Sequence, residues 1–145
     1  MIYHWFKNKN MTKSYLKNLV YQVNGAAIEV HKHIGPGLLE SVYHKCLEQE
    51  LSHRGISFQT ELIIPIQYKD FKIEADLKCD LVIEKKLVVE LKSVKKILQI
   101  HEAQILTYMK LLEVPMGLLI NFNVTNIYKE GQKTYVNEHY RYLED

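Results

Sequence analysis

The chain of 145 residues has few cysteines, no long apolar run and no signal-peptide pattern. Its two cysteines, Cys46 and Cys79, form no cluster with metal-site spacing, so we expect free thiols and a cytoplasmic protein. No apolar run is long enough to span a bilayer, which excludes a membrane-spanning helix and argues against a membrane partner. The first ten residues lack both an apolar core and a small-residue cleavage site, so we expect no signal peptide.

The chain also lacks a strong excess of one charge. Its formal net charge is +2, whereas nucleic-acid-binding domains are more often strongly basic. A local patch is nevertheless sufficient for such binding. Five lysines lie close together in the sequence, namely Lys85, Lys86, Lys92, Lys95 and Lys96. A solvated lysine face is the simpler interpretation of this run.

The composition is otherwise typical of a globular protein, with 47% hydrophobic and 25% charged residues. We find no internal repeat and no linker, and the length suits one domain with a substantial core. We therefore expect a single domain over residues 12–136, a flexible arm over 1–11 and a tail over 137–145. Met11 is an alternative to Met1 as the first residue, and the sequence leaves that choice open.

Hydrophobic residues that recur every three and four positions predict helices over 12–33, 38–54 and 99–112. Thr12 and Ser14 are both suitable N-caps for the first helix. The sequence Gly35-Pro36-Gly37 separates the first two helices, because glycine beyond a helix end followed by proline is a strong stop signal. Glu40 lies in the first turn of the second helix, where the helix dipole favours a carboxylate, and this accounts for Glu40 without any chemistry.

Strand signals predict strands over 58–68, 71–77, 80–83, 87–92 and 116–122, and two weak edge strands joined by a turn at 129–132. The strand over 71–77 either continues into 80–83 or is separated from it by a kink. Pro65 indicates an edge position or a bulge, and residues 71–77 alternate as a half-buried strand does. The strand–helix–strand unit over 87–122 predicts a parallel pair with a right-handed crossover. The sequence therefore predicts an α/β fold with a mixed central sheet flanked by helices.

Residues 79–92 are the most informative stretch, which we interpret as two antiparallel strands around a turn centred on Lys85. In this register Asp80 lies opposite Glu90, and Lys92 shares their face. The other face is all aliphatic: Leu81, Ile83, Leu87, Val89 and Leu91. Facing carboxylates repel, so the pair needs a divalent cation or the Lys92 ammonium beside it. A turn shifted by one residue would separate the two carboxylates.

Two carboxylates beside a lysine suit metal-assisted phosphodiester hydrolysis. Asp80 and Glu90 would hold Mg²⁺ or Mn²⁺, and Lys92 would orient the attacking water or stabilise the transition state. The alternative is an exposed strand face with a Lys–Glu pair, because such short motifs also match by chance. Gln104 and Tyr108 share one stripe of the next helix, which alone indicates only a polar surface.

Several motifs in the same order carry a resemblance to known proteins. Asp80 followed by Glu90-Leu91-Lys92 resembles the core of the PD-(D/E)XK nuclease superfamily, with Cys79 in place of the proline in that name. Residues 104–108 resemble the QxxxY motif of its RecB-like and Cas4-like branches. Residues 37–43 resemble the signature of the GxxExxY family within the superfamily. Residues 25–32 and 117–123 are also similar to that family, so the resemblance covers about residues 15–125.

The resemblance implies a restriction-endonuclease-like α-β-β-β-α-β core and a nuclease that acts on DNA with Mg²⁺ or Mn²⁺, in repair, processing or defence. The implied metal ligands are Asp80, Glu90 and the Leu91 backbone carbonyl. Lys92 would be the catalytic lysine. Glu40 would be the acidic residue from the helix and a further candidate ligand, and Gln104 and Tyr108 would position the substrate or the lysine.

Two other functions stay open at this point, and so does the assembly state. One is a non-catalytic module that keeps the fold and binds nucleic acid or protein, and the other is a subunit of a larger complex. A homodimer is also open. The complete set of Asp80, Glu90 and Lys92 favours the enzyme, since a module without catalysis would not need all three. His31 is a weaker candidate ligand, and a partly exposed helix histidine is its simpler interpretation.

Overall fold

Two helices open the part of the chain that the computed structural model describes, residues 11–73 and 77–145. Helix α1 (Lys13–Ile34) begins where the Thr12 hydroxyl accepts the Tyr15 N–H at 3.0 Å, so Thr12 is the N-cap. It ends at Gly35, whose φ of 69° suits glycine. Helix α2 (Glu40–His53) follows and buries Tyr43, Leu47 and Leu51. Both helices confirm the periodicity-based prediction.

A five-stranded mixed sheet forms the centre of the molecule. Its strands lie in the order β1-β4-β5-β6-β7, with bounds β1 Phe58–Ile63, β4 Lys78–Ile83, β5 Leu87–Lys92, β6 Met116–Asn121 and β7 Gln132–Val136. The β5–β6 pair is parallel and the other pairs are antiparallel. Helix α3 (Gln99–Leu112) connects the parallel strands. These elements confirm the α/β class with a mixed sheet and the α-β-β-β-α-β order.

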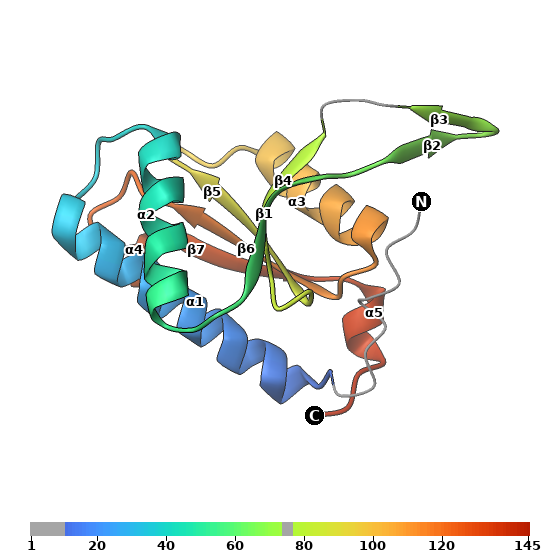
Figure 1. Ribbon diagram of the computed structural model, residues 1–145, viewed down its shortest axis with the longest axis horizontal. Coiled ribbons are helices and arrows are strands. Elements are labelled where there is room, and N and C mark those ends of the chain that lie inside the picture. The colour runs from blue at the N-terminus through green and yellow to red at the C-terminus, as the bar shows by residue number, and fades with distance from the viewer. Residues whose placement is uncertain (1–10, 74–76) are drawn as a thin grey trace.

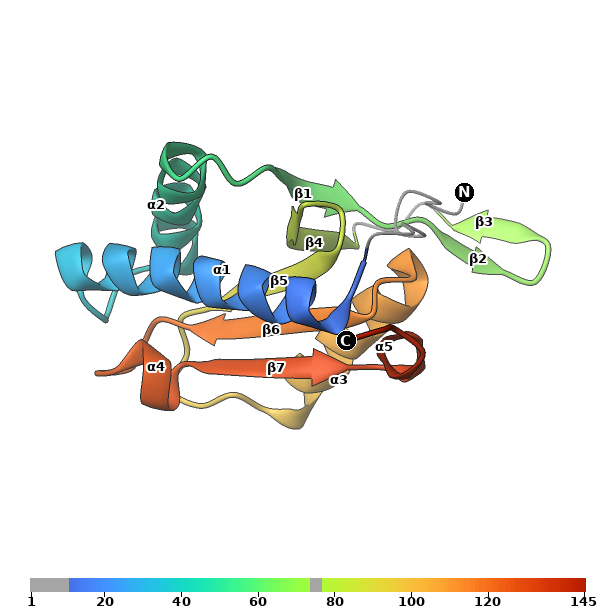
Figure 2. The same cartoon turned by 90° about the horizontal axis from the view of Figure 1, so that it is seen from below.

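Both faces of the sheet are covered, as Figures 1 and 2 show. Helices α1 and α2 pack on one face, where the five aliphatic residues predicted to share a face, from Leu81 to Leu91, all lie in the core. Helix α3 packs on the other face through Ile105 and Met109, against Val82 and Val88. Burial on both sides explains why β5 and β6 are almost continuously hydrophobic in sequence.

A second, two-stranded sheet lies outside this core. Strands β2 (Ile66–Tyr68) and β3 (Phe71–Ile73) pair with each other, and both project from the body in Figures 1 and 2. The single strand expected over 58–68 is wrong, because β1 ends at Ile63 and β2 begins at Ile66 in a different sheet. Pro65, for which we expected an edge position or a bulge, follows the edge strand β1 and lies in the break between the two strands. The prediction of a half-buried strand over 71–77 is wrong for its described part, since Phe71 is 71% exposed and all of β3 is exposed. Ala75, which that prediction included, lies outside the described residues.

The last part of the chain corrects one further expectation. Residues 127–130 form a short helix, α4 (Ile127–Glu130), where we expected the end of the first edge strand and the start of the turn at 129–132. The Asn126 side chain accepts the Lys129 N–H at 3.0 Å and so starts this helix. Only the second expected strand forms, as β7.

The segments expected as an arm and a tail lie at the two ends of the chain. Residues 137–145 include helix α5 (Glu138–Arg141), and Tyr140 and Leu143 pack against the core. The Lys13 N–H donates to the Glu144 carbonyl at 2.8 Å. Of the expected arm over 1–11, only Met11 is described, and it is buried. None of the helices in the described part combines the length and hydropathy that a bilayer-spanning segment needs.

Candidate active site

The hairpin of β4 and β5 has the register that the sequence predicted. Val82 pairs with Val88 and Ile83 with Leu87, which places the turn around Lys85. Glu84 and Lys85 both have left-handed backbones, with φ of 53° and 58°, and the Lys86 N–H closes the turn on the Ile83 carbonyl at 2.9 Å. Paired left-handed residues are typical of tight hairpin turns, because their twist matches that of the flanking strands.

Asp80 and Glu90 each reach across the hairpin to the other strand. The Asp80 N–H donates to Glu90 Oε1 at 2.9 Å. The Leu91 N–H donates to Asp80 Oδ2 at 2.8 Å. The two carboxyl groups therefore lie side by side, and one oxygen of each is held by a backbone amide. These bonds fix both groups without a flexible side-chain partner.

The environment of Glu90 is unfavourable for a bare charge. Its side chain is only 4% exposed. The pKa of Glu90 is raised to about 9, first by burial and next by the neighbouring Asp80 charge, while the Asp80 amide and Lys92 act in the opposite direction. Without a cation the pair therefore holds a proton at neutral pH. A bound cation would replace that proton, because it stabilises both carboxylates together.

Lys92 connects this pair to helix α3. Its Nζ lies 3.5 Å from Gln104 Oε1, to which it donates. Tyr108, one turn further along α3, is buried, and its pKa is raised to about 12, first by burial and next by the charge of Glu90. Gln104 also bonds the Tyr108 hydroxyl and lowers that pKa. The structure thus brings Gln104 and Tyr108 together with Lys92 and Glu90, which the stripe on the helix alone did not establish.

Glu40 approaches the same site from helix α2. Burial raises its pKa; Lys92 and the Ser93 amide lower it, whereas Asp80 raises it. These electrostatic influences place Glu40 near both Lys92 and Asp80. The carboxyl group stays accessible to solvent, since Glu40 is an exposed residue.

Tyr43 holds the loop that leads to Glu40. Its hydroxyl donates to the Gly35 carbonyl at 2.5 Å and accepts the Leu38 N–H at 3.2 Å. Its ring stacks on Phe122 with centroids 4.4 Å apart. Ser93 Oγ adds a bond of 2.6 Å to the Leu38 carbonyl. The loop between α1 and α2 is therefore tied to the end of β5, directly beside Lys92.

Asn121 is a positioning residue that the sequence reasoning did not single out. It pairs with Lys92 across the parallel strands and is 5% exposed. Its side chain accepts the Val94 N–H at 3.1 Å and donates to the Val94 carbonyl at 2.9 Å. It thereby fixes the connector that follows Lys92. The available signal was an asparagine at the end of a buried strand, where an apolar residue is the norm.

His31 lies apart from this group. Its Nε2 is 2.8 Å from the Val124 carbonyl, which ties α1 to the loop after β6. This contact gives His31 a structural role.

The oxygen donors of the site fit a hard divalent cation. Asp80 and Glu90 are carboxylates, and Mg²⁺ binds proteins through one or two carboxylates together with waters and phosphate oxygens. Across residues 11–73 and 77–145, no three His, Cys, Asp or Glu side chains are grouped so as to hold a metal ion. Glu40 therefore does not complete a three-residue metal site with Asp80 and Glu90. These two carboxylates are the donors that are best placed to bind a cation.

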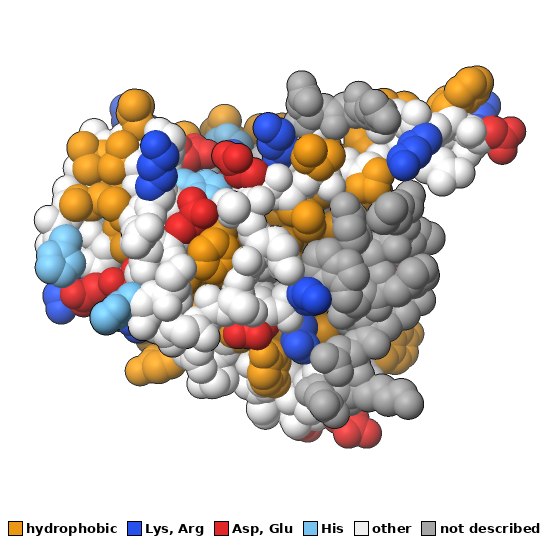
Figure 3. Space-filling model, viewed as in Figure 1, with side chains coloured by type: hydrophobic (Ala, Val, Ile, Leu, Met, Phe, Trp, Pro, Cys, Tyr) orange, Lys and Arg blue, Asp and Glu red, His pale blue; other side chains and the backbone are white. Residues whose placement is uncertain are grey.

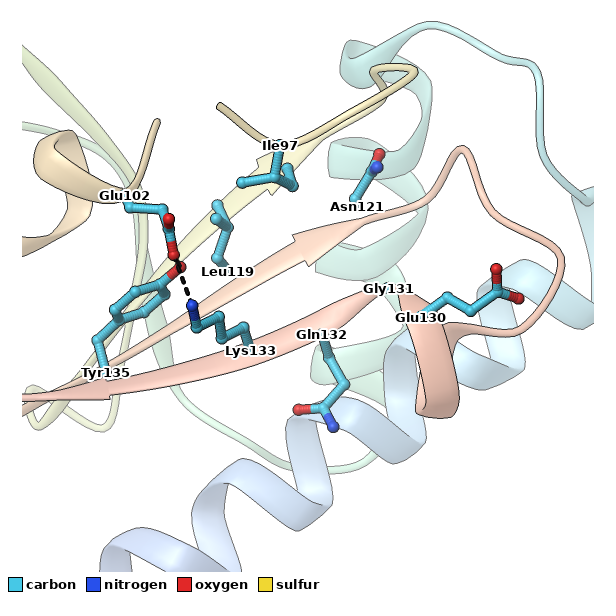
Figure 4. Close-up of a pocket in the computed structure, with 9 residues that line it drawn as sticks. All are labelled: Ile97, Glu102, Leu119, Asn121, Glu130, Gly131, Gln132, Lys133 and Tyr135. Carbon is cyan, nitrogen blue, oxygen red and sulfur yellow. Dashed lines mark hydrogen bonds and ion pairs between the residues drawn. The ribbon is translucent and has the colours of Figure 1, made fainter. Parts of the chain in front are cut away.

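A separate pocket of about 310 Å³ lies beside β6 and β7 (Figure 4). Glu102 accepts hydrogen bonds there from Lys133 at 2.8 Å and from Tyr135 at 2.5 Å. Asn121 lines this pocket, but the six predicted side chains of the site do not. The Glu102 carboxylate is satisfied by these two bonds, so we assign this group of three side chains a structural role.

Comparison with known proteins identifies one family. A protein-family model described as PD-(D/E)XK nuclease superfamily matches residues 17–134 of the sequence. This match confirms the resemblance at the level of the superfamily. The matched residues include the β4–β5 hairpin, α2 and α3. Comparison with curated proteins and with solved structures gave no significant match.

Proposed function

The chain belongs to the PD-(D/E)XK nuclease superfamily, and from this premise we propose a nuclease that hydrolyses phosphodiester bonds of DNA with Mg²⁺ or Mn²⁺. Membership indicates nuclease activity, nucleic-acid binding and the use of divalent metals, which are general in the superfamily. DNA as the substrate and a role in repair, processing or defence are the finer proposal. The observation that carries it is the fixed pair of Asp80 and Glu90 beside Lys92.

In the proposed mechanism the residues of the hairpin divide the work. Asp80, Glu90 and the Leu91 carbonyl would hold the cation, with Glu40 as a further ligand. When bound, the cation would polarise the phosphate and lower the pKa of a water molecule. Lys92 would place its ammonium against the charge that develops on the phosphate.

Gln104 and Tyr108 would act on Lys92 and on the substrate backbone. Gln104 accepts from the Lys92 Nζ and so limits where that ammonium points. Tyr108 keeps its proton at neutral pH, because its pKa is raised to about 12. It would therefore serve as a hydrogen-bond donor to a phosphate oxygen.

Four finer assignments accompany this proposal. The GxxExxY family is supported by residues 37–43, in which Tyr43 orders the loop before Glu40. The RecB-like and Cas4-like branch is supported by the position of Gln104 and Tyr108. A cytoplasmic location is supported by the two free cysteines. A single domain over 12–136 is supported by a core that joins α1, α2 and the sheet.

A cleavage assay tests the function directly. Supercoiled plasmid, linear duplex and single-stranded DNA are incubated with Mg²⁺ or Mn²⁺, with EDTA as a control. We expect Lys92→Ala to lower the cleavage rate by roughly 100-fold or more, because it removes a charge that stabilises the transition state. Lys95→Ala, which changes an exposed lysine three residues away, should stay within about 3-fold of the wild type.

Two results would count against the enzyme. Cleavage that persists in Lys92→Ala would indicate a contaminating nuclease. No cleavage, together with no binding of Mg²⁺ or Mn²⁺ in calorimetry, would favour a non-catalytic module or a subunit of a larger complex. The observation that supports this non-catalytic alternative is that no three possible metal ligands are grouped in the described part of the chain. It predicts that EDTA leaves nucleic-acid binding unchanged.

A further inference from the structure

The β2–β3 hairpin is anchored to the core at its base and exposed at its tip. Ile64 is 1% exposed, and its N–H donates to the Leu77 carbonyl at 2.8 Å. Beyond this point, among the described residues, β2 and β3 pair only with each other, and they extend away from the helices in Figures 1 and 2. The tip shows hydrophobic and charged side chains together in Figure 3.

One face of this hairpin is entirely hydrophobic. The register places Ile66 opposite Ile73 and Tyr68 opposite Phe71. Since side chains alternate along a strand, these four residues share one face, whereas Gln67 and Lys72 lie on the other. Tyr68 is 58% exposed, Phe71 71% and Ile73 41%. The Lys69 ammonium lies 5.4 Å from the centre of the Tyr68 ring.

The size of this face decides which partner it suits. Large aromatic side chains bury about 150–250 Å² each when covered, so the exposed part of the face offers roughly 300–350 Å². A stable protein dimer buries about 800 Å² on each partner. The face is therefore too small to hold a second copy of the chain. Two neighbouring aromatic rings match the area of one or two stacked bases.

The position of the hairpin relative to the site points the same way. Strand β3 leads through Leu77 into β4, whose third residue is Asp80. The hairpin thus leaves the sheet at the end that carries the candidate site. A nucleic acid held at Asp80 would pass beside the hairpin. Lys69 lies beside the Tyr68 ring, and Lys72 lies on the opposite face of the same hairpin, so the tip carries two ammonium groups that suit phosphates, with the acidic Asp70 in the turn.

We propose that the β2–β3 hairpin is a substrate-binding arm, in which Tyr68 and Phe71 stack on unpaired bases of a nucleic acid bound at the site. The bases of a duplex are already stacked on one another, so the arm selects single-stranded or unpaired regions. This inference rests on the proposed nuclease function, because it takes the nucleic acid from that function. It adds the strand type of the substrate and the residues that recognise it.

Binding of fluorescent oligonucleotides tests the arm. Lys92→Ala serves as the background, so that cleavage does not interfere, and the probes are a 20-residue thymidine strand and a 20-base-pair duplex. We expect Tyr68→Ser with Phe71→Ser to weaken binding of the single strand by about 30-fold or more, because both rings on which bases would stack are lost. Binding of the duplex should change by less than about 3-fold.

Matched variants separate stacking from other effects. Tyr21→Ser removes a tyrosine that is 77% exposed on α1, and it should leave both affinities unchanged. Phe71→Trp should keep the affinity for the single strand. Phe71→Leu stays apolar but has no ring, so it should lose most of the affinity that Phe71 contributes. All variants should melt within about 2 °C of the wild type, because the tip is exposed.

Each remaining outcome decides between the two proposals. Equal losses on single strand and duplex, or full affinity in Phe71→Leu, would overturn the arm. So would a wild type that sediments as a dimer and becomes monomeric on Phe71→Ser with unchanged oligonucleotide affinity. A wild type that binds no single strand would also overturn it. Arm-dependent binding of the single strand without cleavage by the wild type would instead overturn the nuclease function and leave the arm in place.

Discussion

Replacing Glu90 by glutamine should change how the stability of the protein depends on pH. The folded protein raises the pKa of Glu90 to about 9, from an ordinary value of 4.5. Between these two values the folded state binds a proton that the unfolded state has released. This contribution to stability is therefore complete below about pH 4.5 and is lost as the pH rises toward 9. Glutamine carries no titratable proton and keeps an oxygen for the Asp80 N–H.

The expected magnitude follows from the linkage relation. A single group bound only by the folded state changes the free energy of unfolding by up to about 1.4 kcal/mol per pH unit. In metal-free buffer the wild type should lose roughly 3–4 kcal/mol between pH 5 and pH 8. For a domain of this size the loss corresponds to a fall in Tm on the order of 10 °C. Glu90→Gln should lose much less over the same range.

Urea denaturation and thermal melting in EDTA, at half-unit steps from pH 5 to pH 8.5, measure this difference. Glu130→Gln, which changes an exposed carboxylate, is the matched control and should follow the wild type. If the free energy of unfolding changes equally with pH in the wild type and in Glu90→Gln, Glu90 does not retain its proton, and the raised pKa of Glu90 is wrong.

The same measurement with Mg²⁺ or Mn²⁺ tests the donor set. A ligand that binds only the folded state adds about 2.7 kcal/mol at 100 times its Kd. At pH 8 the metal should therefore restore much of the stability that the wild type has lost, and restore little in Glu90→Gln. Equal stabilisation of both proteins would place the cation elsewhere.

Two further substitutions test the residues that position the site. Tyr43→Phe removes the hydroxyl that bridges Gly35 and Leu38, so it should lower the free energy of unfolding by about 1–2 kcal/mol in urea titrations. It should also reduce the cleavage rate by more than the increase in unfolded protein explains. Asn121→Ala leaves both backbone groups of Val94 without their partner, so it should destabilise by about 2–4 kcal/mol in the same titrations, whereas Asn121→Asp should retain the acceptor half of that contact.

The regular part of the fold was accessible from sequence because local signals agreed there. The α3 bounds coincide with the predicted 99–112, since apolar periodicity and Val114-Pro115 define the same helix. The β4–β5 register followed from aliphatic alternation around a charged turn. In these segments propensity, hydrophobic pattern and turn chemistry all indicate one structure.

The errors arose where a pattern was ambiguous or too short. Phe71 and Ile73 alternate with polar residues as a half-buried strand does, but no helix of the described chain covers their hydrophobic face. Helix α4 has four residues, a length at which no helical period is detectable, and it depends on the cap that Asn126 provides. Alternation shows that a face is apolar, and it does not show what that face contacts.

The contacts around Asp80 were also beyond the sequence, because the strand is irregular at this residue. Strict alternation places Cys79 and Leu81 on the same face. Instead Cys79 lies in the core beneath α3 and Leu81 in the core beneath α1. Between their partners on β1, Glu61 has a left-handed backbone with φ of 48°. A non-glycine residue in this region costs on the order of 1 kcal/mol or more, which surrounding contacts must offset.

This irregularity explains how the carboxylate pair forms. In a regular ladder the Asp80 N–H would serve a neighbouring strand, but here it donates to the Glu90 side chain. The Asp80 carboxylate is in turn free to accept the Leu91 N–H. Strand irregularities that redirect a side chain are frequent beside active sites. Thus the pairing of Asp80 with Glu90 was visible in the hydrophobic pattern, whereas the backbone departure that turns both carboxylates onto main-chain amides required the three-dimensional structure.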